Sequence, residues 1–382
     1  MAHPQAEWRH TQATRGQIVA SLLSEPNLSR SDLVERLGLG PATVSTQVRR
    51  LLELGILTEG PSQVVGAGRP RVPLSVRGDT GRAIGVGMGV SSAAFTVINL
   101  DGTILDERRL DLDTSDPEAL SRSIGSVTHR IVETDPGAPW WGLGVAVSGV
   151  VAESTGMVSF SVVHNWEAVP LGNLVERQAG LPVRLANDIA ALAYRELYRP
   201  RVETPSDFLL VSVGSGVGMA LVRDHQVITG DQGASTEMGH VSVDPLGPAC
   251  RCGNHGCLQA LLGLDELLRE AARVSPDVGD SVEDLVAAAV SNHRVARVVD
   301  RGGYWLGRAV GGACTMVGLS NVLLTGESLP LWPHMAAGFE TGLHETVPTL
   351  TNPPNIERRA WDPAATAVGA ATIVLNRVLG SG

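Results

Sequence analysis

The sequence lacks lysine, long apolar runs and a recognisable secretory signal. All 30 basic residues are arginine, which we attribute to the base composition of the genome rather than to function. No apolar run is long enough to span a bilayer, and the amino end does not resemble a signal peptide, so we expect neither a transmembrane nor a secreted protein. We therefore expect a cytoplasmic protein, in which reduced thiols bind metal rather than pair as disulfides.

The length and the uneven distribution of charge indicate more than one domain. A chain of 382 residues is too long for a single hydrophobic core, so two or three domains are expected. Residues 1–77 hold nine Arg against six Asp and Glu, a net charge of +3, whereas the whole chain carries −10 and the remainder therefore −13. The acidic body would repel a polyanion, while the basic amino-terminal region can approach one.

Metal-binding residue types are concentrated in one segment. His240 is followed by Cys250, Cys252 and Cys257 in the spacing H-x9-C-x-C-x4-C. One imidazole and three thiolates fill a tetrahedral zinc shell and leave no position for water, which predicts a structural zinc site. The alternative is that these thiols are core residues or form disulfides, but three cysteines within eight residues suit core packing poorly.

Residues 14–54 show the pattern of a helix-turn-helix. Apolar residues at helical spacing predict a first helix over 14–23, and Ser29 with Asp32 provides a capping-box-like start for a second. Glycines end the second helix, and a third is predicted over 42–54. Its predicted core positions are Val44, Val48, Leu51 and Leu52. Two helices joined by a glycine-containing turn are typical of proteins that read DNA.

The segment after these helices predicts a wing, which disfavours the alternative of a small helical bundle with a solvated polar face. Strands are expected over 56–59 and 71–76, joined by a Gly-rich linker whose arginines suit a narrow minor groove. Double-stranded DNA is therefore an expected partner. The predicted contacts with base edges are Thr43, Ser45, Thr46 and Gln47, and those with phosphates or the minor groove are Arg49, Arg50, Arg69 and Arg71.

Two similar α/β units follow the head. A buried strand over 83–90 runs into a glycine turn, and Asp101-Gly102 predicts a type I′ hairpin shortly afterwards. A similar unit recurs where a strand over 208–213 precedes the loop Gly214–Gly218 and a second hairpin at 223–226. The other elements predicted here are strands over 94–99, 141–147 and 219–222 and a helix over 117–133. We infer an internal duplication with a ligand cleft between its halves.

These motifs together resemble those of the ROK family (repressors, open reading frames and kinases), and specifically its transcriptional repressors. The resemblance covers the chain from about residue 12 to the carboxyl end. The elements that carry it are Glu237-x-Gly239-His240, the cysteine cluster, Asn187-Asp188, the loop Gly214–Gly218 and Gly68-Arg69-Pro70. It implies an α/β fold in which a winged helix-turn-helix precedes two actin-like, ribonuclease-H-like domains with a sugar cleft between them.

The resemblance implies three domains. They are a DNA-binding domain over 1–77, a smaller actin-like domain over 78–188 with 362–382, and a larger actin-like domain over 189–361 that carries the zinc loop and a dimerisation surface.

The resemblance also implies a sugar site. Asn187 and Asp188 correspond to residues that bind sugar hydroxyls, and Asp188 stands where the kinases keep their catalytic base. Glu237 and His240 correspond to further sugar contacts. His240 can serve as both a metal ligand and a sugar contact, since a metal on one imidazole nitrogen leaves the other as a donor to a hydroxyl. Asn165 also lies near a segment that often lines the sugar site in this family. From the residues alone, Asn187-Asp188 is equally a cap for a helix over 189–197, and the two roles are compatible.

Departures from the kinases of the family indicate a sensor rather than an enzyme. Their phosphate loop, Asp-x-Gly-Gly-Thr, is replaced by Gly87-Met88-Gly89-Val90-Ser91, which lacks the acidic residue that organises a magnesium–phosphate complex. Glu327 brings negative charge towards the place where the kinases hold a nucleotide. Gln259 replaces an acidic residue, and its amide should change which sugar fits. We therefore predict no catalysis, with Asp188 as the vestige of a base.

The sequence thus predicts an allosteric, sugar-responsive transcriptional regulator, a repressor of genes for carbohydrate uptake or metabolism. The expected effector is a sugar or sugar phosphate, the cofactor a structural zinc ion, and the assembly a homodimer or tetramer on symmetric DNA half-sites. One alternative is an ATP-dependent sugar kinase with an appended DNA-binding head, which Asp188 and the loop Gly214–Gly218 favour. The other is a protein whose zinc loop contacts a partner protein while sugar binding is vestigial.

Overall fold

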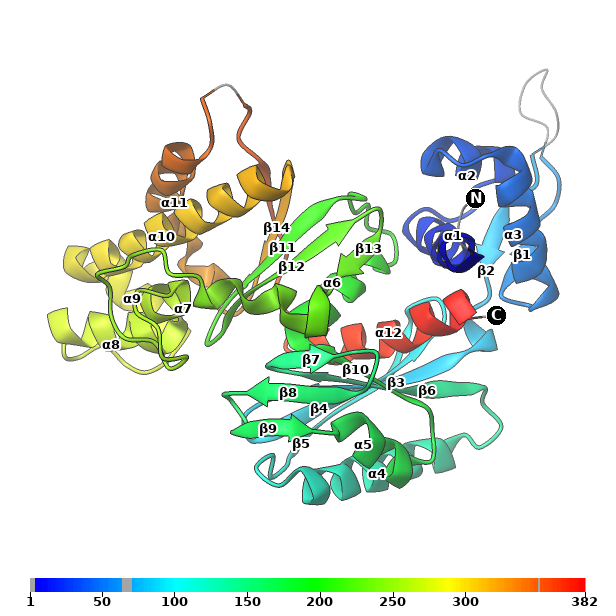
Figure 1. The fold of residues 1–382 in the computed structure, drawn as a ribbon, viewed down its shortest axis with the longest axis horizontal. Coiled ribbons are helices and arrows are strands. Elements are labelled where there is room, and N and C mark those ends of the chain that lie inside the picture. The colour runs from blue at the N-terminus through cyan, green and yellow to red at the C-terminus, as the bar shows by residue number, and fades with distance from the viewer. Residues whose placement is uncertain (1–3, 64–70, 350, 382) are drawn as a thin grey trace. The chain divides into compact units, whose positions relative to one another are not determined.

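The chain folds into two compact units. The structure, a computed structural model, describes residues 4–63, 71–349 and 351–381. The units comprise residues 1–204 with 364–382 and residues 205–363 (Figure 1). This division differs from the expected boundary at 188/189, because helix α6 (Asp188–Leu197) packs against helix α12 (Ala365–Ser381) within the first unit. The amino-terminal head also belongs to the first unit.

The head has the predicted helices and wing. Its elements are α1 (Pro4–Ser24), α2 (Arg30–Leu37), α3 (Pro41–Glu53), β1 (Leu57–Glu59) and β2 (Leu74–Val76), with β1 and β2 antiparallel. The predicted capping box is present at the start of α2, where Ser29 N–H donates to Asp32 at 2.8 Å and the Ser29 hydroxyl accepts from Asp32 N–H. Gly38 ends α2 in the left-handed conformation, φ 62°, which explains the glycine there.

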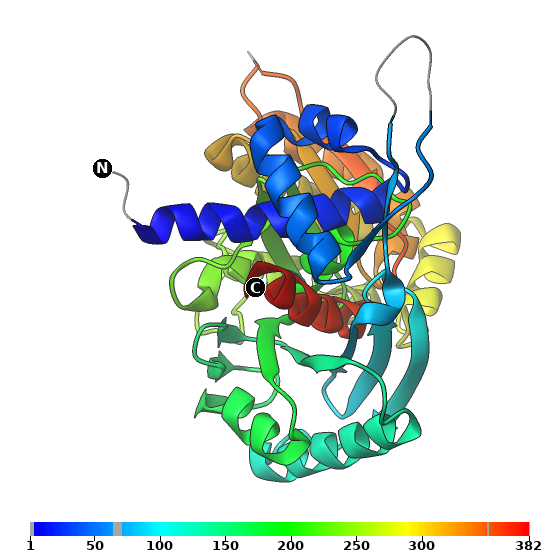
Figure 2. The ribbon, with the colours of Figure 1, turned by 90° about the vertical axis from the view of Figure 1, so that its right-hand side faces the viewer.

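Two details of the head differ from the predictions. Helix α1 begins well before residue 14 and lies against α12 (Figure 2). The prediction that Gln47 faces away from the core is wrong, since its side chain is only 9% exposed. Gln47 lies three residues after Val44 and four before Leu51, both fully buried, so position on the helix outweighs polarity.

A five-stranded sheet forms the body of the first unit. Its order is β10-β6-β3-β4-β5, with β3, β4 and β5 antiparallel and with β6 and β10 parallel to β3. The bounds are β3 (Arg82–Met88), β4 (Ser92–Asn99), β5 (Ile104–Asp111), β6 (Trp140–Val147) and β10 (Val183–Asn187). Helices α4 (Pro117–Thr134) and α5 (Leu171–Ala179) cover one face, and α12 covers the other (Figure 1). A small antiparallel sheet consists of β7 (Val150–Ala152), β8 (Met157–Ser161) and β9 (Trp166–Val169).

Helix α12 approaches this sheet closely because the strands below it carry glycine. A Cβ atom on Gly85 would lie 1.8 Å from the carbonyl oxygen of Ala367, and one on Gly144 would lie 1.8 Å from that of Ala370. Alternate glycines in β3 and β6 therefore create the groove in which the carboxyl-terminal helix lies.

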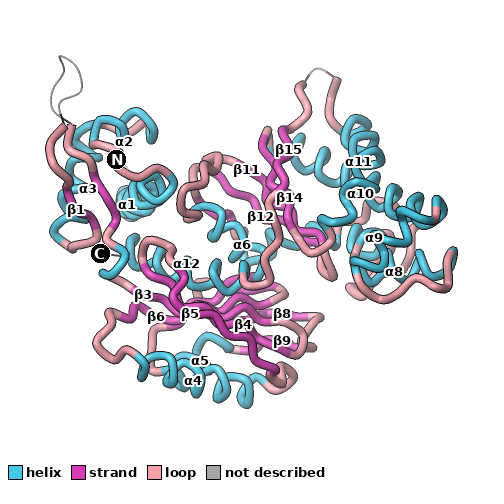
Figure 3. The backbone as a smooth tube through the Cα atoms, turned by 180° about the vertical axis from the view of Figure 1, so that it is seen from behind, coloured by secondary structure: helices cyan, strands magenta, loops and turns pink. Residues whose placement is uncertain are grey.

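The second unit repeats the topology of the first. Its sheet has the order β13-β12-β11-β14-β15 (Figure 3). As in the first sheet, three neighbouring strands, β13, β12 and β11, are antiparallel, and the other two, β14 and β15, run parallel to β11. The bounds are β11 (Phe208–Val213), β12 (Val217–Arg223), β13 (Gln226–Ile228), β14 (Asn321–Thr325) and β15 (Asn355–Arg358). The predicted duplication is thereby confirmed, and with it the α/β fold class.

Helices complete the second unit. They are α7 (Leu258–Leu262), α8 (Leu264–Val274), α9 (Val282–Ser291), α10 (His293–Val317) and α11 (Trp332–Thr346), and short 3-10 segments are η1 (Gly78–Thr80) in the first unit and η2 (Asp231–His240) and η3 (Leu329–Leu331) in the second. Apolar side chains of α7, α8, α10 and α11 form one core with β11 and β14. Among the described residues, no helix combines the length and the apolarity needed to cross a bilayer.

One of the two predicted hairpins differs from the prediction in its turn type. The hairpin between β4 and β5 is present, but Gly102, with φ 79°, has positive φ and Asp101 does not, so the predicted type I′ turn is wrong. Asn99 N–H donates to Thr103 at 2.9 Å across a three-residue loop, which needs a left-handed residue only at its end. At the second hairpin Asp224 and His225 both have positive φ, 52° and 58°, which is the type I′ geometry.

Candidate functional site

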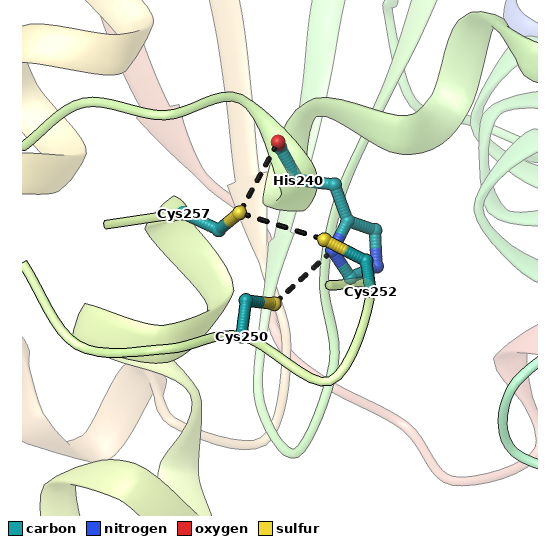
Figure 4. Close-up of side chains that lie close together, drawn as sticks. All are labelled: His240, Cys250, Cys252 and Cys257. Carbon is teal, nitrogen blue, oxygen red and sulfur yellow. Dashed lines mark hydrogen bonds between the residues drawn. The ribbon is translucent and has the colours of Figure 1, made fainter. Parts of the chain in front are cut away.

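The four predicted metal ligands converge in the second unit (Figure 4). Their ligand atoms all lie within 4.8 Å of one another. Cys250 Sγ lies 3.5 Å from His240 Nδ1, and Cys252 Sγ lies 3.6 Å from Cys257 Sγ. Zinc–ligand bonds of about 2.3 Å to sulfur and about 2.0 Å to nitrogen place two tetrahedral sulfurs about 3.8 Å apart, and sulfur and nitrogen about 3.5 Å apart. The donor set and its spacing therefore fit a structural zinc ion.

Backbone hydrogen bonds shape the loop that carries the cysteines. Cys250 N–H donates to Asn254 at 2.7 Å, and Val243 N–H donates to Gly256 at 2.9 Å. Gly256 has φ 62°, and a Cβ there would lie 1.5 Å from the carbonyl oxygen of Asp244, so this position requires glycine. Burial raises the pKa of the Cys257 thiol to about 12, and a bound cation is what would favour the thiolate there.

His240 presents its two ring nitrogens to different partners. Nδ1 faces Cys250, whereas Nε2 lies 3.8 Å from Glu237 Oε2, too far for a direct hydrogen bond. Burial lowers the pKa of His240 and raises that of Glu237. Position 239, between them in the sequence, requires glycine, because a Cβ there would lie 2.0 Å from the carbonyl oxygen of Val217. The pair can therefore offer one hydroxyl both a donor, Nε2–H, and an acceptor, the carboxyl oxygen.

The loop Gly214–Gly218 is bound by side chains of its own unit. Val217 N–H donates to Gln259 Oε1 at 2.7 Å, and Gln259 Nε2 donates to the carbonyl oxygen of Ser215 at 2.8 Å. Both polar ends of the Gln259 amide therefore hold the loop, which is not the position expected of a sugar contact. Glu327 Oε1 accepts hydrogen bonds from the Ser215 N–H and, at 2.6 Å, from its hydroxyl.

In the first unit, Asn187 acts as the cap of helix α6. Its Oδ1 accepts from the N–H groups of Ile189 and Ala190 at 2.8 and 3.3 Å, and its Nδ2 donates to the carbonyl oxygen of Gly149 at 2.9 Å. The helix cap inferred from the residues alone is confirmed. Asp188 is the first residue of α6 and is half-buried, and its Oδ1 accepts from Ile189 N–H at 2.9 Å.

One residue beside the predicted Asn165 was not identified from the sequence. His164 is 5% exposed, its ring lies 4.7 Å from that of Trp166, and neither ring nitrogen has a hydrogen-bond partner in the described part of the chain. Burial lowers its pKa, so the ring is neutral at pH 7. Asn165 has φ 55°, in the left-handed region that asparagine tolerates. In the sequence, only the neighbouring Asn165 and Trp166 indicate that His164 is part of a site, since a single histidine by itself does not predict a function.

The segment Gly87–Ser91 has no room for an acidic side chain at its start. A Cβ on Gly87 would lie 2.5 Å from Thr366 Oγ1 and 2.9 Å from Ala367 N, at the beginning of α12. Val90 is 71% exposed at the turn between β3 and β4.

The predicted DNA-contacting residues are largely exposed on the head. Thr43, Thr46, Arg49 and Arg50 are exposed, and Ser45 is half-buried. Gln47 is buried, as described above. Arg71 forms an ion pair with Asp32 at 2.9 Å and a backbone bridge with Gln63. Arg69 lies outside the described residues.

Similarity to known proteins covers nearly the whole chain. Residues 83–377 match the family described as "ROK family", and residues 12–58 match "Winged helix-turn-helix DNA-binding". The xylose repressor of Bacillus spizizenii is 25% identical over 95% of this chain and 94% of its own length. The dual regulator NagC of Escherichia coli is 24% identical over 78% of this chain and 77% of its own length.

Solved structures show the same fold. A ROK family transcriptional regulator, a homologue of the Escherichia coli MLC protein, superposes with a TM-score of 0.80 at 23% identity and covers 97% of both chains. A ROK family glucokinase from Streptomyces griseus, in complex with glucose and AMPPNP, has a TM-score of 0.65 at 22% identity and covers 76% of this chain and 98% of its own. The body without the head thus has the architecture of both regulators and kinases.

Proposed function

Because the chain belongs to the ROK family, we propose that it is a sugar-responsive transcriptional repressor that binds operator DNA through its winged helix-turn-helix. The carrying observation is the presence of that head ahead of the family domain, in a chain that aligns over 95% of its length with a relative named xylose repressor. The protein acts in the cytoplasm, where it reaches both DNA and metabolites.

The proposed DNA surface is the exposed side of helix α3 with the wing. Short polar side chains face the base edges, and arginines face phosphates or the minor groove. The proposed contacts are Thr43, Ser45, Thr46, Arg49, Arg50, Arg69 and Arg71. Two heads of a homodimer, or of a tetramer, bind symmetric half-sites.

The proposed effector is a sugar or sugar phosphate. The proposed sugar contacts are Asn165, Asn187, Asp188, Glu237 and His240. The 3.8 Å separation of His240 Nε2 and Glu237 Oε2 suits a hydroxyl that bridges the two side chains. His240 Nδ1, which faces Cys250, would be the nitrogen that holds a zinc ion, and the imidazole tautomer would then carry its hydrogen on Nε2 as a donor.

We propose further that this site binds without phosphorylating. The absence of an acidic residue at position 87 leaves no ligand for a magnesium–phosphate complex, and Thr366 occupies the space an aspartate would need. Asp188 is then the remnant of a base whose reaction partner is lost.

The decisive experiment measures operator binding with and without sugar. The zinc-loaded protein is titrated onto duplexes that it selects from a random pool, alone and with D-xylose, N-acetylglucosamine, glucose or their phosphates. At least one sugar should change the DNA affinity by about fivefold to a hundredfold, the usual range of allosteric coupling. DNA affinity that no sugar changes would refute the proposal, and ATP consumption abolished by Asp188→Asn would support the kinase instead.

A further inference from the structure

A glycine loop of the second unit has its backbone donors bound internally. Strand β11 ends at Val213 and is followed by Gly214-Ser215-Gly216, while the parallel strand β14 ends beside it and is followed by Gly326-Glu327. The carboxyl ends of neighbouring parallel strands are where α/β sheets bind ligands. A glycine loop at this edge, with its N–H groups pointing outward, is a usual place for an anion.

Three of the four N–H groups from residue 214 to 217 have acceptors within the unit. Gly214 donates to Gly216 at 3.0 Å, Ser215 donates to Glu327, and Val217 donates to Gln259 at 2.7 Å. The acceptor at Ser215 is a carboxylate, and the same oxygen also accepts from the Ser215 hydroxyl at 2.6 Å. One negatively charged oxygen thus binds a backbone N–H and a hydroxyl together, as a phosphate oxygen does.

Close packing holds Glu327 against the loop. A Cβ on Gly214 would lie 2.6 Å from Glu327 Cγ, and one on Gly326 would lie 2.2 Å from the carbonyl oxygen of Val213. Ser328 N–H donates to that same carbonyl at 3.0 Å. The packing of Gly214 and Gly326 and the hydrogen bond of Ser328 therefore fix the backbone around Glu327, and its carboxylate is held against the loop.

We propose that the loop Gly214–Val217 is an anion-binding site which the Glu327 carboxylate fills from inside the protein, so that phosphate groups of free ligands are excluded. The proposal refines the proposed function, because it names a residue that keeps a kinase-like body from binding nucleotide. Removal of the carboxylate should open a site for phosphate groups.

The test compares phosphate binding by wild type, Glu327→Ala and Glu327→Gln. Calorimetry and thermal-shift measurements use inorganic phosphate, ADP and glucose 6-phosphate, with chloride at matched ionic strength as the reference. Wild type should show no signal with inorganic phosphate or ADP beyond that of chloride, and Glu327→Ala should bind both at least about tenfold more tightly, since two hydrogen-bond donors are freed. Glu327→Gln keeps an acceptor but loses the charge, so its affinity should lie between the two. The three ligands distinguish a site for phosphate alone from one for a nucleotide or a sugar phosphate.

Glu340→Ala, which removes an exposed carboxylate of α11 in the same unit, is the matched control and should behave as wild type. The proposal is overturned if folded Glu327→Ala or, should that variant not fold, Glu327→Gln binds phosphate no better than wild type. It is also overturned if wild type already binds phosphate as well as the variants. Sugar-dependent DNA binding is measured separately on the wild type, so failure of the proposed function is recognised independently.

Discussion

Glu153, just after strand β7, carries a carboxyl group in an unfavourable environment. Its Oε1 is buried and has no hydrogen-bond partner among the described residues. Burial raises its pKa to about 7, although Arg377 acts in the opposite direction, and Tyr194 of α6 is its other ionisable neighbour. The unfolded chain releases this proton near pH 4.5. The stability associated with the neutral acid is therefore fully present below pH 4.5 and is lost as the pH rises to about 7.

We predict that Glu153→Gln raises the free energy of unfolding at pH 8 by up to about 3 kcal/mol and changes it little at pH 4.5. The amide stays neutral, so it avoids the cost of ionising a buried acid. Urea unfolding across this pH range measures the effect. Glu133→Gln, at an exposed position of α4, should give a flat difference. An equal effect of Glu153→Gln at both pH values would contradict the role of burial.

The metal ligands yield a second prediction at the residue scale. Cys250→Ser should abolish the equimolar zinc of the wild type and lower Tm by about 5 °C or more, roughly 2 kcal/mol for a unit of this size, because the remaining ligands no longer close a tetrahedral shell. Elemental analysis and calorimetry measure both quantities. Cys314→Ser, in the core of α10, removes a thiol outside the cluster and should leave the zinc content unchanged. Full zinc content in Cys250→Ser would show that the ligand set is misassigned.

Local signals explain which site residues could be predicted from the sequence. The four proposed metal ligands lie within a segment of 18 residues, so their spacing alone predicts a metal site. The contact of Glu327 with Ser215 joins residues 112 positions apart and exists only because β11 and β14 are neighbours in the sheet. No sequence pattern predicts that the ring nitrogens of His164 are buried without a hydrogen-bond partner among the described residues, since burial depends on the packing of the surrounding elements.

At the scale of elements, packing decides what propensity leaves open. Hydrophobic periodicity predicts individual elements such as β3, β11, α3 and α4, whereas the strand order and the turn types depend on which strands pair and in which register. Asp101-Gly102 has a favoured type I′ sequence but lies in a three-residue loop, while Asp224-His225 adopts that geometry without glycine. The same competition places Gln47 in the core, because the helix turns it towards its buried neighbours.

Helices α10 and α11 provide the element-scale prediction. A Cβ on Gly307 would lie 2.0 Å from the carbonyl oxygen of Phe339, whereas one on Gly312, in the same helix, would meet nothing within 4 Å. Gly307→Ala should therefore destabilise the protein by about 2–3 kcal/mol through overpacking, despite better helix propensity. Gly312→Ala should stabilise it by up to about 1 kcal/mol. Denaturant unfolding compares the two, and equal effects would contradict the close helix contact.

At the scale of the whole chain, helix α6 connects the proposed ligand residues of the first unit to the DNA-binding head. It begins at Asp188 and is capped at its far end by Tyr198. The Tyr198 hydroxyl donates to Asn376 Oδ1 of α12, and a Cβ on Gly16 of α1 would lie 2.8 Å from that hydroxyl. Arg201 N–H, just beyond α6, also donates to the carbonyl oxygen of Leu23 at 3.0 Å. A movement of α6 would therefore displace α1.

This contact predicts a reciprocal pair of substitutions. Gly16→Ala should destabilise the head against the body by about 1–3 kcal/mol, because its methyl group meets the Tyr198 hydroxyl. In the Tyr198→Phe background only the 3.0 Å approach to Asn376 Oδ1 remains, so the same substitution should destabilise less, and the double-mutant cycle should give a coupling of about 1 kcal/mol or more. Thermal unfolding measures the cycle, with Tyr194→Phe, one turn earlier on α6, as the control background.

If α6 transmits the sugar signal, Tyr198→Phe should retain DNA affinity while reducing the dependence of that affinity on sugar. The reason is that sugar occupancy can change operator binding only through a contact that differs between the sugar-bound and sugar-free states. Additive stabilities together with an unchanged sugar response would show that the head is coupled to the body by another route.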